Sequence, residues 1–294
     1  MSISIERIGF VGLGNMGTPM ASRLIEAGYQ VAGFDLAPEA RQRLAEAGGT
    51  AVETAVAAAE GADLVILMLP NSDIVENVVL NDGVLDALAE GAIIADMSSS
   101  EPLRTQALAE KVSAAGRRLI DAPVSGGVKG AVAGTLAIMV GASEEELAIL
   151  RPVLEVLGKP TLVGPVGAGH ALKALNNLMS AIHLWGSSEA LLAGIRFGLD
   201  PEVILPVINA SSGRSGSTDL KWPNFIVPET YNSGFGLRLM LKDMKIAQGL
   251  EESMGVSHEL ADLAVERWSR AAEDLPPNAD HTEVARWIKE HSAS

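Results

Sequence analysis

A glycine-rich loop near the N-terminus constrains the fold of this chain more than any other feature. The apolar run at residues 8–11 leads directly into a G-x-G-x-x-G pattern at residues 12–17, and residues 18–27 have the composition of a helix. In such a strand–loop–helix unit the first glycine permits a tight turn, the second lets the backbone approach a pyrophosphate, and the third allows close helix packing. An isolated match is weak, because ordinary turns also collect glycines. The residues expected to contact a dinucleotide are Gly12, Leu13, Gly14, Asn15 and Met16.

An acidic residue after the next apolar run supports the dinucleotide prediction. The run at residues 31–34 ends at Asp35, which stands 23 residues after Gly12. At about this spacing a carboxylate accepts hydrogen bonds from the adenosine ribose hydroxyls. A 2′-phosphate would place like charges together, and Leu36 and Ala37 offer no arginine to offset them. We therefore expect NAD in preference to NADP; the alternative interpretation of Asp35 is a solvated loop acid.

Short apolar runs alternate with helix-like stretches through the first half of the chain. The runs lie at residues 8–11, 31–34, 64–69, 93–95 and 118–120. Strand alternating with helix predicts a doubly wound parallel sheet of the Rossmann type. Ligands bind such sheets outside the carboxyl ends of the strands, which places Leu69 and Pro70 beside the expected cofactor. Simple turn or helix-cap chemistry is the alternative for these strand ends.

A cluster of glycines and a proline at residues 164–169 ends this alternation. Beyond it helical periodicity dominates, and we expect helices at residues 201–209, 239–254, 258–272 and 282–290. Residues 174–188 carry no formal charge, which is typical of a helix buried by protein on most sides. The sequence thus predicts a Rossmann domain at residues 1–163 and an all-helical domain at residues 164–294, joined by a long interdomain helix.

Composition excludes several classes of function. The formal charge is −15, from 22 basic and 37 acidic residues, and this field would repel nucleic acid and anionic membranes. There is no cysteine, and the five histidines lack metal-ligand spacing, so we expect no metal. The longest apolar run, residues 64–69, is too short to span a bilayer, and the N-terminus has no signal-peptide pattern. We expect a metal-free protein of the reducing cytoplasm.

One lysine is a candidate general acid/base. Lys173 lies near the start of the uncharged helix, and Asn177, four residues later, shares its face. Burial and the positive end of the helix both disfavour the ammonium form, which would lower the lysine pKa toward the range that acid/base catalysis needs. A lysine whose amine reaches solvent is the alternative. Ser125, Gly126 and Gly127 follow a strand and could cradle a small carboxylate, although such a segment is also typical of an ordinary turn.

Four motifs, in order along the chain, together resemble the β-hydroxyacid dehydrogenase family. They are I-G-F-V-G-L-G-N-M-G-T-P-M-A-S-R at 8–23, D-A-P-V-S-G-G at 121–127, G-x-G-x-x-x-K-x-x-N-N at 167–177 and K-D-M at 242–244. The resemblance implies NAD(P)-dependent oxidation of a small 3-hydroxy acid, or reduction of the matching semialdehyde, in a cleft between the two domains. Substrates of the 3-hydroxyisobutyrate or tartronate semialdehyde type are implied, and so is a homodimer or homotetramer.

The resemblance also implies a role for each motif residue. Lys173 is the general acid/base, and Asn177 binds the reacting oxygen. Ser125, Gly126 and Gly127 bind the substrate carboxylate. Ser99 stands beside the nicotinamide ribose, Lys242 reaches the cofactor, and Asp243 fixes Lys242 or the cleft.

Three alternatives remain beside this interpretation. A decarboxylating enzyme like 6-phosphogluconate dehydrogenase shares the lysine and asparagine, but has histidine where this chain has Asn176, and no phosphate-binding cluster is visible. Relatives that act on imines usually replace the lysine. A non-catalytic NAD-binding sensor on the same fold is the third alternative. It is disfavoured because Lys173, Asn177 and Ser125 are all present.

Overall fold

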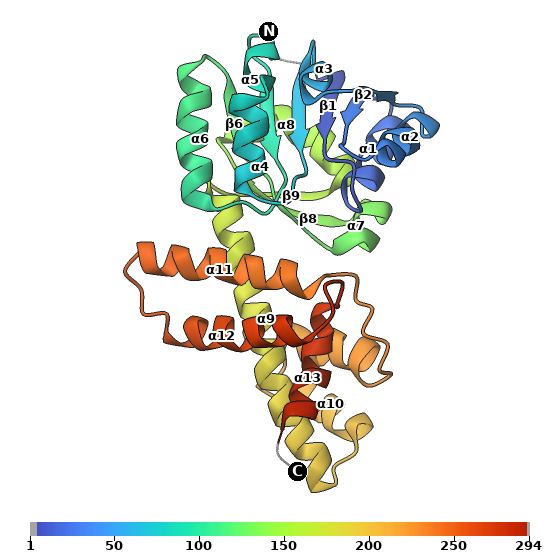
Figure 1. Cartoon of the computed structure of the whole chain (residues 1–294), viewed down its shortest axis with the longest axis vertical. Helices are drawn as coiled ribbons and strands as arrows, with labels where there is room; N and C mark the ends of the chain where they lie inside the picture. The colour runs from blue at the N-terminus through green and yellow to red at the C-terminus, as the bar shows by residue number, and fades with distance from the viewer. Residues whose placement is uncertain (1–4, 293–294) are drawn as a thin grey trace. The chain divides into compact units, whose positions relative to one another are not determined.

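The computed structural model describes residues 5–292, which fold into two compact units (Figure 1). The first unit ends at Lys173 and the second begins at Ala174. The boundary expected from the sequence lies earlier, between residues 163 and 164. In the structure the division falls within the helix Ala168–Phe197.

The first unit is built on a mostly parallel sheet. Its described strands are β1 (Arg7–Val11), β2 (Gln30–Phe34), β3 (Thr50–Ala51), β4 (Leu64–Leu67), β5 (Ile93–Asp96), β6 (Arg118–Asp121), β7 (Val124–Ser125), β8 (Leu136–Gly141) and β9 (Gly158–Gly164). The order across the sheet is β3-β2-β1-β4-β5-β6-β8-β7, with β9 paired to β8. All neighbours from β3 to β6 are parallel, and β8 runs antiparallel to β6 and β7. The chain reverses direction across the sheet between β3 and β4, which places the β1 loop at the switch point where such sheets bind ligands.

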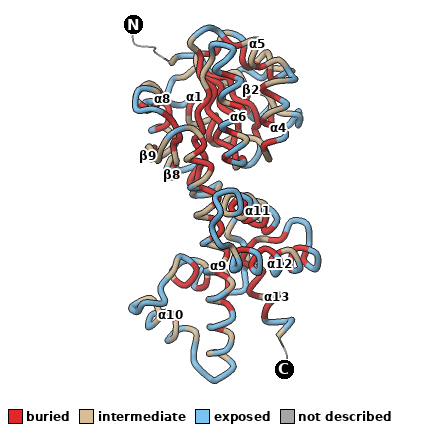
Figure 2. The backbone as a smooth tube through the Cα atoms, turned by 90° about the vertical axis from the view of Figure 1, so that its left-hand side faces the viewer, coloured by how far each residue is buried: buried red, intermediate tan, exposed pale blue. Residues whose placement is uncertain are grey.

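Helices cover both faces of this sheet. On one face lie α1 (Gly17–Glu26), α2 (Pro38–Glu46), α7 (Gly127–Ala133) and α8 (Glu144–Leu157). On the other lie α3 (Ala55–Ala59), α4 (Ser72–Glu76), the π-helix η1 (Asn77–Asn81), α5 (Val84–Ala87) and α6 (Pro102–Ala114). Successive strand residues alternate between the two cores, because side chains of a strand point to opposite faces. Ile66 packs in the first core and Leu67 in the second, and Figure 2 shows the strands buried.

The expected Rossmann architecture is confirmed, and the five expected apolar runs form β1, β2, β4, β5 and β6. The structure adds four strands that the sequence analysis does not predict. β3 and β7 have two residues each, which is too short for a periodic signal. β9 contains Pro160 between flanking glycines, a pattern that argues against a strand. It is tolerated because β9 pairs only with β8, at an edge where a missing N–H costs little.

The second unit is helical. Its described elements are α10 (Pro201–Asn209), the π-helix η2 (Ser217–Ile226), α11 (Leu237–Ser253), α12 (Glu259–Asp274), the 3₁₀ helix η3 (His281–Glu283) and α13 (Val284–His291). The four helices expected from periodicity correspond to α10, α11, α12 and α13. All four contribute residues to one buried cluster, which includes the fully buried Trp268 of α12.

Helix α9 (Ala168–Phe197) is the long helix that the sequence predicts. Its 30 residues correspond to a length of about 45 Å. The helix begins in the first unit and continues through the second. In the second unit Ala174, Leu178, Ala181 and Leu184 form one buried stripe, at the three- and four-residue spacing of a helix face.

Candidate active site

The glycine loop has the geometry that a dinucleotide site requires. Gly12 has φ +98°, and a Cβ there would collide with the carbonyl oxygen of Met68. A Cβ on Gly17 would collide with the carbonyl oxygen of Gly12, so this glycine lets α1 pack against the turn. Gly14 differs from both, since a Cβ there meets nothing within 4 Å. The loop therefore has no space for a side chain at Gly12 and Gly17, where it packs against the protein. It has space at Gly14, where a pyrophosphate would approach.

The Asp35 carboxylate lies against this loop at the carboxyl end of β2. Its Oδ2 accepts the backbone N–H of Leu13 at 2.7 Å, and its Oδ1 accepts that of Ala37 at 2.8 Å. The backbone N–H of Gly12 donates to the carbonyl oxygen of Phe34 at 2.9 Å. These bonds hold an acidic side chain beside the expected pyrophosphate position, which fits the adenosine ribose of a dinucleotide.

The fold brings an arginine close to Asp35, although Leu36 and Ala37, which follow it in the sequence, are not basic. Arg41, on α2, donates from Nη1 to the backbone carbonyl of Asp35 at 2.7 Å. Its Nη2 lies 2.9 Å from Oε2 of Glu53. The guanidinium is thus near the adenosine end of the expected site, but it is already paired with a carboxylate.

The loops after β4 and β5 lie together, as expected from the parallel sheet. The backbone N–H of Leu69 donates to Oγ of Ser98 at 2.9 Å, and the backbone N–H of Glu101 donates to Oγ of Ser72 at 2.8 Å. These two cross-links bring Leu69 and Pro70 close to the segment that contains Ser99. The three predicted cofactor residues therefore belong to one edge of the sheet.

The segment expected to hold a carboxylate is a strand end followed by two glycines. Ser125 is the last residue of β7 and is half-buried. Gly126 and Gly127 have φ values of +132° and +60°, which other residues rarely adopt. The local backbone therefore requires both glycines, whatever they bind.

Lys173 and Asn177 are both buried, with 7% and 5% of their surfaces exposed. They stand one turn apart on α9 and share a face of the helix. Most of the lysine surface is therefore shielded from solvent, which favours the acid/base interpretation over a solvent-exposed lysine. A buried amine and a buried amide on one face of a helix are suited to proton transfer and to hydrogen bonding at a single reacting atom.

In the second unit an aspartate of α11 contacts two of the predicted residues. Asp243 is 2% exposed, and its Oδ2 accepts a hydrogen bond from Nδ2 of Asn177 at 2.6 Å. Its Oδ1 lies 3.4 Å from Nζ of Lys242. The expected contact between Asp243 and Lys242 is present. The bond to Asn177 is not predictable from the sequence, because the two residues lie 66 positions apart.

Two further buried residues of the first unit, Asp121 and His170, have no role assigned from sequence alone. Asp121 accepts the backbone N–H groups of Gly167 and His170, at the start of α9. A sequence signal for this contact exists: the residues before α9 are Pro165, Val166 and Gly167, none of which has a side chain that caps a helix. The first N–H groups of such a helix need acceptors from water or from a distant residue, and here Asp121 supplies them.

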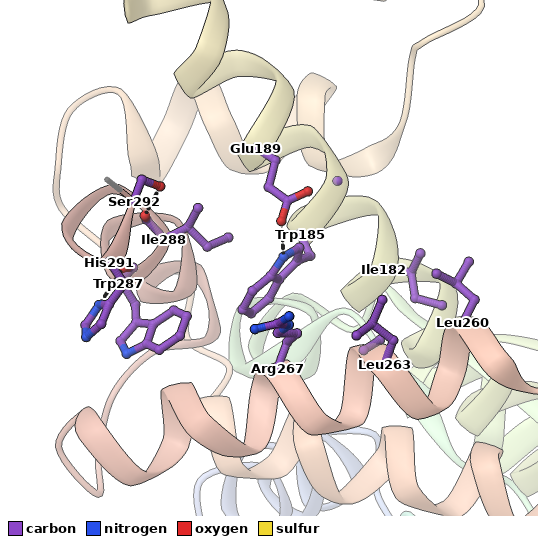
Figure 3. A pocket seen from close by; sticks show the side chains of 12 residues that line it. Ile182, Trp185, Glu189, Leu260, Leu263, Arg267, Trp287, Ile288, His291 and Ser292 are labelled. Atoms are coloured by element: carbon purple, nitrogen blue, oxygen red, sulfur yellow. Dashed lines mark hydrogen bonds between the residues drawn. The ribbon is translucent and has the colours of Figure 1, made fainter. Parts of the chain in front are cut away.

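The second unit also contains a groove of about 400 Å³. Its lining residues are Ile182, Trp185, Gly186, Glu189, Leu260, Leu263, Ala264, Arg267, Trp287, Ile288, His291 and Ser292. Figure 3 shows the Trp185 and Arg267 side chains extending toward each other across it. None of the predicted catalytic or cofactor residues lines this groove, so we do not assign the reaction to it.

Within residues 5–292 no cluster of three or more His, Cys, Asp or Glu side chains could hold a metal ion. Over the same residues no helix is long and apolar enough to cross a membrane.

Known proteins resemble this chain over nearly its whole length. A 3-hydroxyisobutyrate dehydrogenase from Pseudomonas aeruginosa is 41% identical over 266 residues, which cover 87% of this chain and 89% of the relative. A 2-(hydroxymethyl)glutarate dehydrogenase from Eubacterium barkeri is 42% identical over 243 residues, 82% of this chain and 81% of the relative. The solved structure of Mycobacterium tuberculosis 3-hydroxyisobutyrate dehydrogenase with L-serine has a TM-score of 0.92 at 32% identity, over 98% of this chain and 100% of that one.

A Rossmann unit with this glycine loop, followed by a helical unit, is typical of oxidoreductases that use a nicotinamide dinucleotide. Residues 7–167 match the family described as the NAD binding domain of 6-phosphogluconate dehydrogenase, and residues 167–288 match NAD-binding of NADP-dependent 3-hydroxyisobutyrate dehydrogenase. The chain belongs to the β-hydroxyacid dehydrogenase family, which confirms the resemblance in its motifs. It is a hydroxyacid oxidoreductase.

Proposed function

We propose that the protein interconverts a small 3-hydroxy carboxylate and the corresponding semialdehyde, with Lys173 as the general acid/base. The observation that carries this proposal is the pair of buried polar side chains on α9. Lys173 and Asn177 are each less than a tenth exposed and share one helix face, and Asn177 is fixed by Asp243. Burying a lysine costs free energy of folding, because its charge loses hydration. Such buried ionisable groups are concentrated at functional sites.

Each residue has one task in this reaction. When bound, the nicotinamide cofactor supplies the hydride chemistry at substrate C3. Nζ of Lys173 takes the hydroxyl proton during oxidation and returns it to the aldehyde oxygen during reduction. The Asn177 amide donates to the same oxygen and fixes it relative to the lysine.

Other predicted residues bind and orient the two reactants. Ser125, Gly126 and Gly127 hold the substrate carboxylate through one hydroxyl and backbone N–H groups. Ser99 and Lys242 contact the cofactor. None of these residues takes part in proton transfer, so their loss is expected to raise KM more than it lowers kcat.

The names of the similar proteins indicate the substrate class. 3-Hydroxyisobutyrate, 2-(hydroxymethyl)glutarate and L-serine all carry a hydroxymethyl group on the carbon that bears the carboxylate. They differ in the remaining substituent on that carbon, which is methyl, carboxyethyl or amino. We infer that this chain recognises the shared hydroxymethyl carboxylate, in a substrate of the 3-hydroxyisobutyrate or tartronate semialdehyde type.

We further propose that NAD is preferred over NADP. Support comes from the Asp35 carboxylate beside the loop, which would repel a 2′-phosphate. Arg41 could offset that repulsion, but its guanidinium is paired with Glu53. The acidic composition disfavours nucleic acid and anionic membranes as partners. It also repels small carboxylates, so local cations such as Lys173 must attract the substrate that we propose.

Self-association into a homodimer or homotetramer is also part of the proposal. The second unit exposes large apolar side chains, among them Phe197, which is 85% exposed, and Met179, Val203, Val207, Leu260 and Leu263. Apolar exposure on this scale favours an interface between protein chains. We propose the cytoplasm as the location, since a chain without cysteine suits a reducing compartment.

The decisive experiment follows consumption of NADH and NADPH with glyoxylate and with succinic, tartronic and methylmalonic semialdehydes. Wild type is compared with Lys173→Ala and with Lys159→Ala, which removes an exposed lysine of β9 as a matched control. We expect one semialdehyde to be turned over by wild type and by the control. The loss in Lys173→Ala is expected to be about 10²- to 10⁴-fold, with NADH binding retained. Full activity in Lys173→Ala would contradict the proposal.

A further inference from the structure

Helix α9 begins without a capping residue of its own, and a distant carboxylate replaces it. The first N–H groups of a helix have no partner within the helix. Here Oδ1 of Asp121 accepts the N–H of Gly167 at 2.6 Å, and Oδ2 accepts the N–H of His170 at 2.8 Å. Asp121 is the last residue of β6 and is fully buried. One carboxylate therefore fastens the start of α9 to the carboxyl end of the sheet.

Glycines make room for this carboxylate on two sides. A Cβ on Gly141 of β8 would collide with Oδ1 of Asp121. A Cβ on Gly169 would collide with the carbonyl oxygen of Met139 and would lie 2.8 Å from Oδ2 of Asp121. Neither position tolerates a side chain while the helix stays where it is. The second glycine of the G-x-G-x-x-x-K motif is therefore explained by the approach of α9 to Asp121.

The side chain of His170 makes a second fastening from the same turn. Nε2 lies 3.1 Å from the carbonyl oxygen of Ser98, and since a carbonyl only accepts, Nε2 carries a hydrogen and donates it. Nδ1 lies 2.8 Å from Oγ1 of Thr105, on α6. His170 is 1% exposed, so both contacts are shielded from water. The first turn of α9 is thus tied to β6, to the loop after β5 and to α6.

Buried charge in this arrangement is costly. Nε2 of His170 lies 3.8 Å from Oδ2 of Asp96, and Nδ1 lies 3.8 Å from Oδ2 of Asp121. Burial raises the pKa of Asp121, and the His170 ring with the two backbone N–H groups opposes that rise. Apolar residues of similar volume often give equal or greater stability than a buried ionic cluster. The geometry that these residues impose on the start of α9 therefore explains their presence better than a gain in folding stability does.

We propose that Asp121 and His170 are positioning residues, which fix the height and rotation of α9 and thereby the location of the Lys173 amine. Lys173 follows His170 by three residues, so it lies on the next turn and on nearly the same side of the helix. A displacement of about 1 Å at a reacting group can cost about 100-fold in rate. This inference rests on the proposed role of Lys173.

The test is a kinetic comparison of Asp121→Asn, His170→Gln and wild type. Asparagine keeps the shape of Asp121 but has one acceptor oxygen where the two N–H groups need two. We expect kcat to fall about 10- to 100-fold in each variant, with the KM for NADH unchanged. The limb of the pH–kcat/KM profile that reports Lys173 is expected to shift, because the amine has moved relative to its surroundings.

A matched control separates positioning from stability. Asp63 also accepts two backbone N–H groups, from Glu6 and Arg7, both at 2.9 Å, but at the start of β1. Both bonds reach one oxygen, Oδ2, which the amide oxygen of asparagine could replace, so the control is Asp63→Ala. It should lower the Tm without changing kcat or the pH profile. His170→Gln leaves the Asp121 cap in place, so it provides a folded variant if Asp121→Asn does not fold.

The outcomes distinguish this inference from the proposed function. An unchanged kcat and pH profile in folded His170→Gln and Asp121→Asn would overturn the positioning role, and so would equal effects in Asp63→Ala. If these variants are active while Lys173→Ala is inactive, the proposed function stands without the positioning role. If Lys173→Ala is itself active, the proposed function is wrong, and the positioning inference that rests on it fails with it.

Discussion

The Nδ2 amide of Asn177 donates a 2.6 Å hydrogen bond to Oδ2 of Asp243, and this bond fixes the orientation of the asparagine. A carboxylate can only accept, so the nitrogen of the amide faces Asp243. Oδ1 of Asn177 in turn accepts from Nδ2 of Asn176 at 3.2 Å. The second hydrogen of Nδ2 is the one that we assign to the substrate oxygen.

Removing either member of this pair should therefore impair the same step. We expect Asn177→Ala to lower kcat/KM about 10²- to 10³-fold, as for loss of one donor to a reacting oxygen. Asp243→Asn should cost about 10-fold, because the charge-assisted bond that orients Asn177 is lost. Steady-state kinetics with the best semialdehyde measure both.

A double variant tests whether the two residues act as a unit. Asn177→Ala combined with Asp243→Asn should be scarcely worse than Asn177→Ala alone, since the aspartate then has no amide to orient. Losses that multiply in the double variant would show that Asp243 acts independently, for instance through Lys242.

The three loop glycines should respond differently to alanine. Gly17→Ala forces a Cβ into the carbonyl oxygen of Gly12, and we expect a loss of at least about 1–3 kcal/mol in unfolding free energy. Gly14→Ala meets nothing in the protein, so its Tm should match that of wild type. Its affinity for NADH should fall, because the added methyl group occupies the surface that the pyrophosphate approaches.

Thermal unfolding without cofactor and an NADH titration by fluorescence measure these two effects separately. Wild-type NADH affinity in Gly14→Ala would argue against pyrophosphate binding at this loop. A stable Gly17→Ala protein would argue against the close packing described for α1.

Cofactor preference should depend on the pairing of Arg41 with Glu53. Glu53→Gln frees the guanidinium for a 2′-phosphate and should move the ratio of kcat/KM for NADH over NADPH toward NADPH by about 10-fold. Asp35→Asn should lower kcat/KM for NADH and reduce the same ratio, because the acceptor for the ribose hydroxyls is weakened and the repulsion is removed. If neither change alters this ratio, residues other than Asp35 and Arg41 determine the preference between NADH and NADPH.

Sequence patterns predicted the parts of this molecule that depend on local order. The glycine loop, Asp35 and the strand–helix alternation are contiguous, so their spacing indicates both the sheet and its cofactor edge. Lys173 stands out because residues 174–188, which follow it on the same helix, carry no formal charge. Asn177 stands out because it lies four residues later, on the same helix face.

Long-range contacts explain what the sequence did not predict. Asp121 caps a helix 46 residues away, and Arg41 meets Glu53 only because α2 and the segment after β3 are adjacent in the fold. β9 forms despite Pro160 because it needs a partner on one side only. In each case the folded neighbour, rather than the local pattern, determines the role of the residue.

Lys221 of η2 should make stability depend on pH. Its Nζ donates to Oγ of Ser180 at 2.7 Å, and burial lowers its pKa from 10.5 to about 8, with Asp280 opposing the change. Between about pH 8 and pH 10.5 the unfolded chain therefore binds a proton that the folded chain does not. Stability from this group rises with pH across that window and is lost as pH falls through about 8.

Lys221→Met keeps the aliphatic stem and removes the titration. The difference in unfolding free energy, wild type minus Lys221→Met, should therefore increase between about pH 7 and pH 9.5, as measured by urea denaturation. Lys159→Met, which replaces an exposed lysine in the same way, is measured in parallel as the control for the substitution itself. A pH-independent difference for Lys221→Met would mean that the folded state leaves this amine as well hydrated as the unfolded chain does.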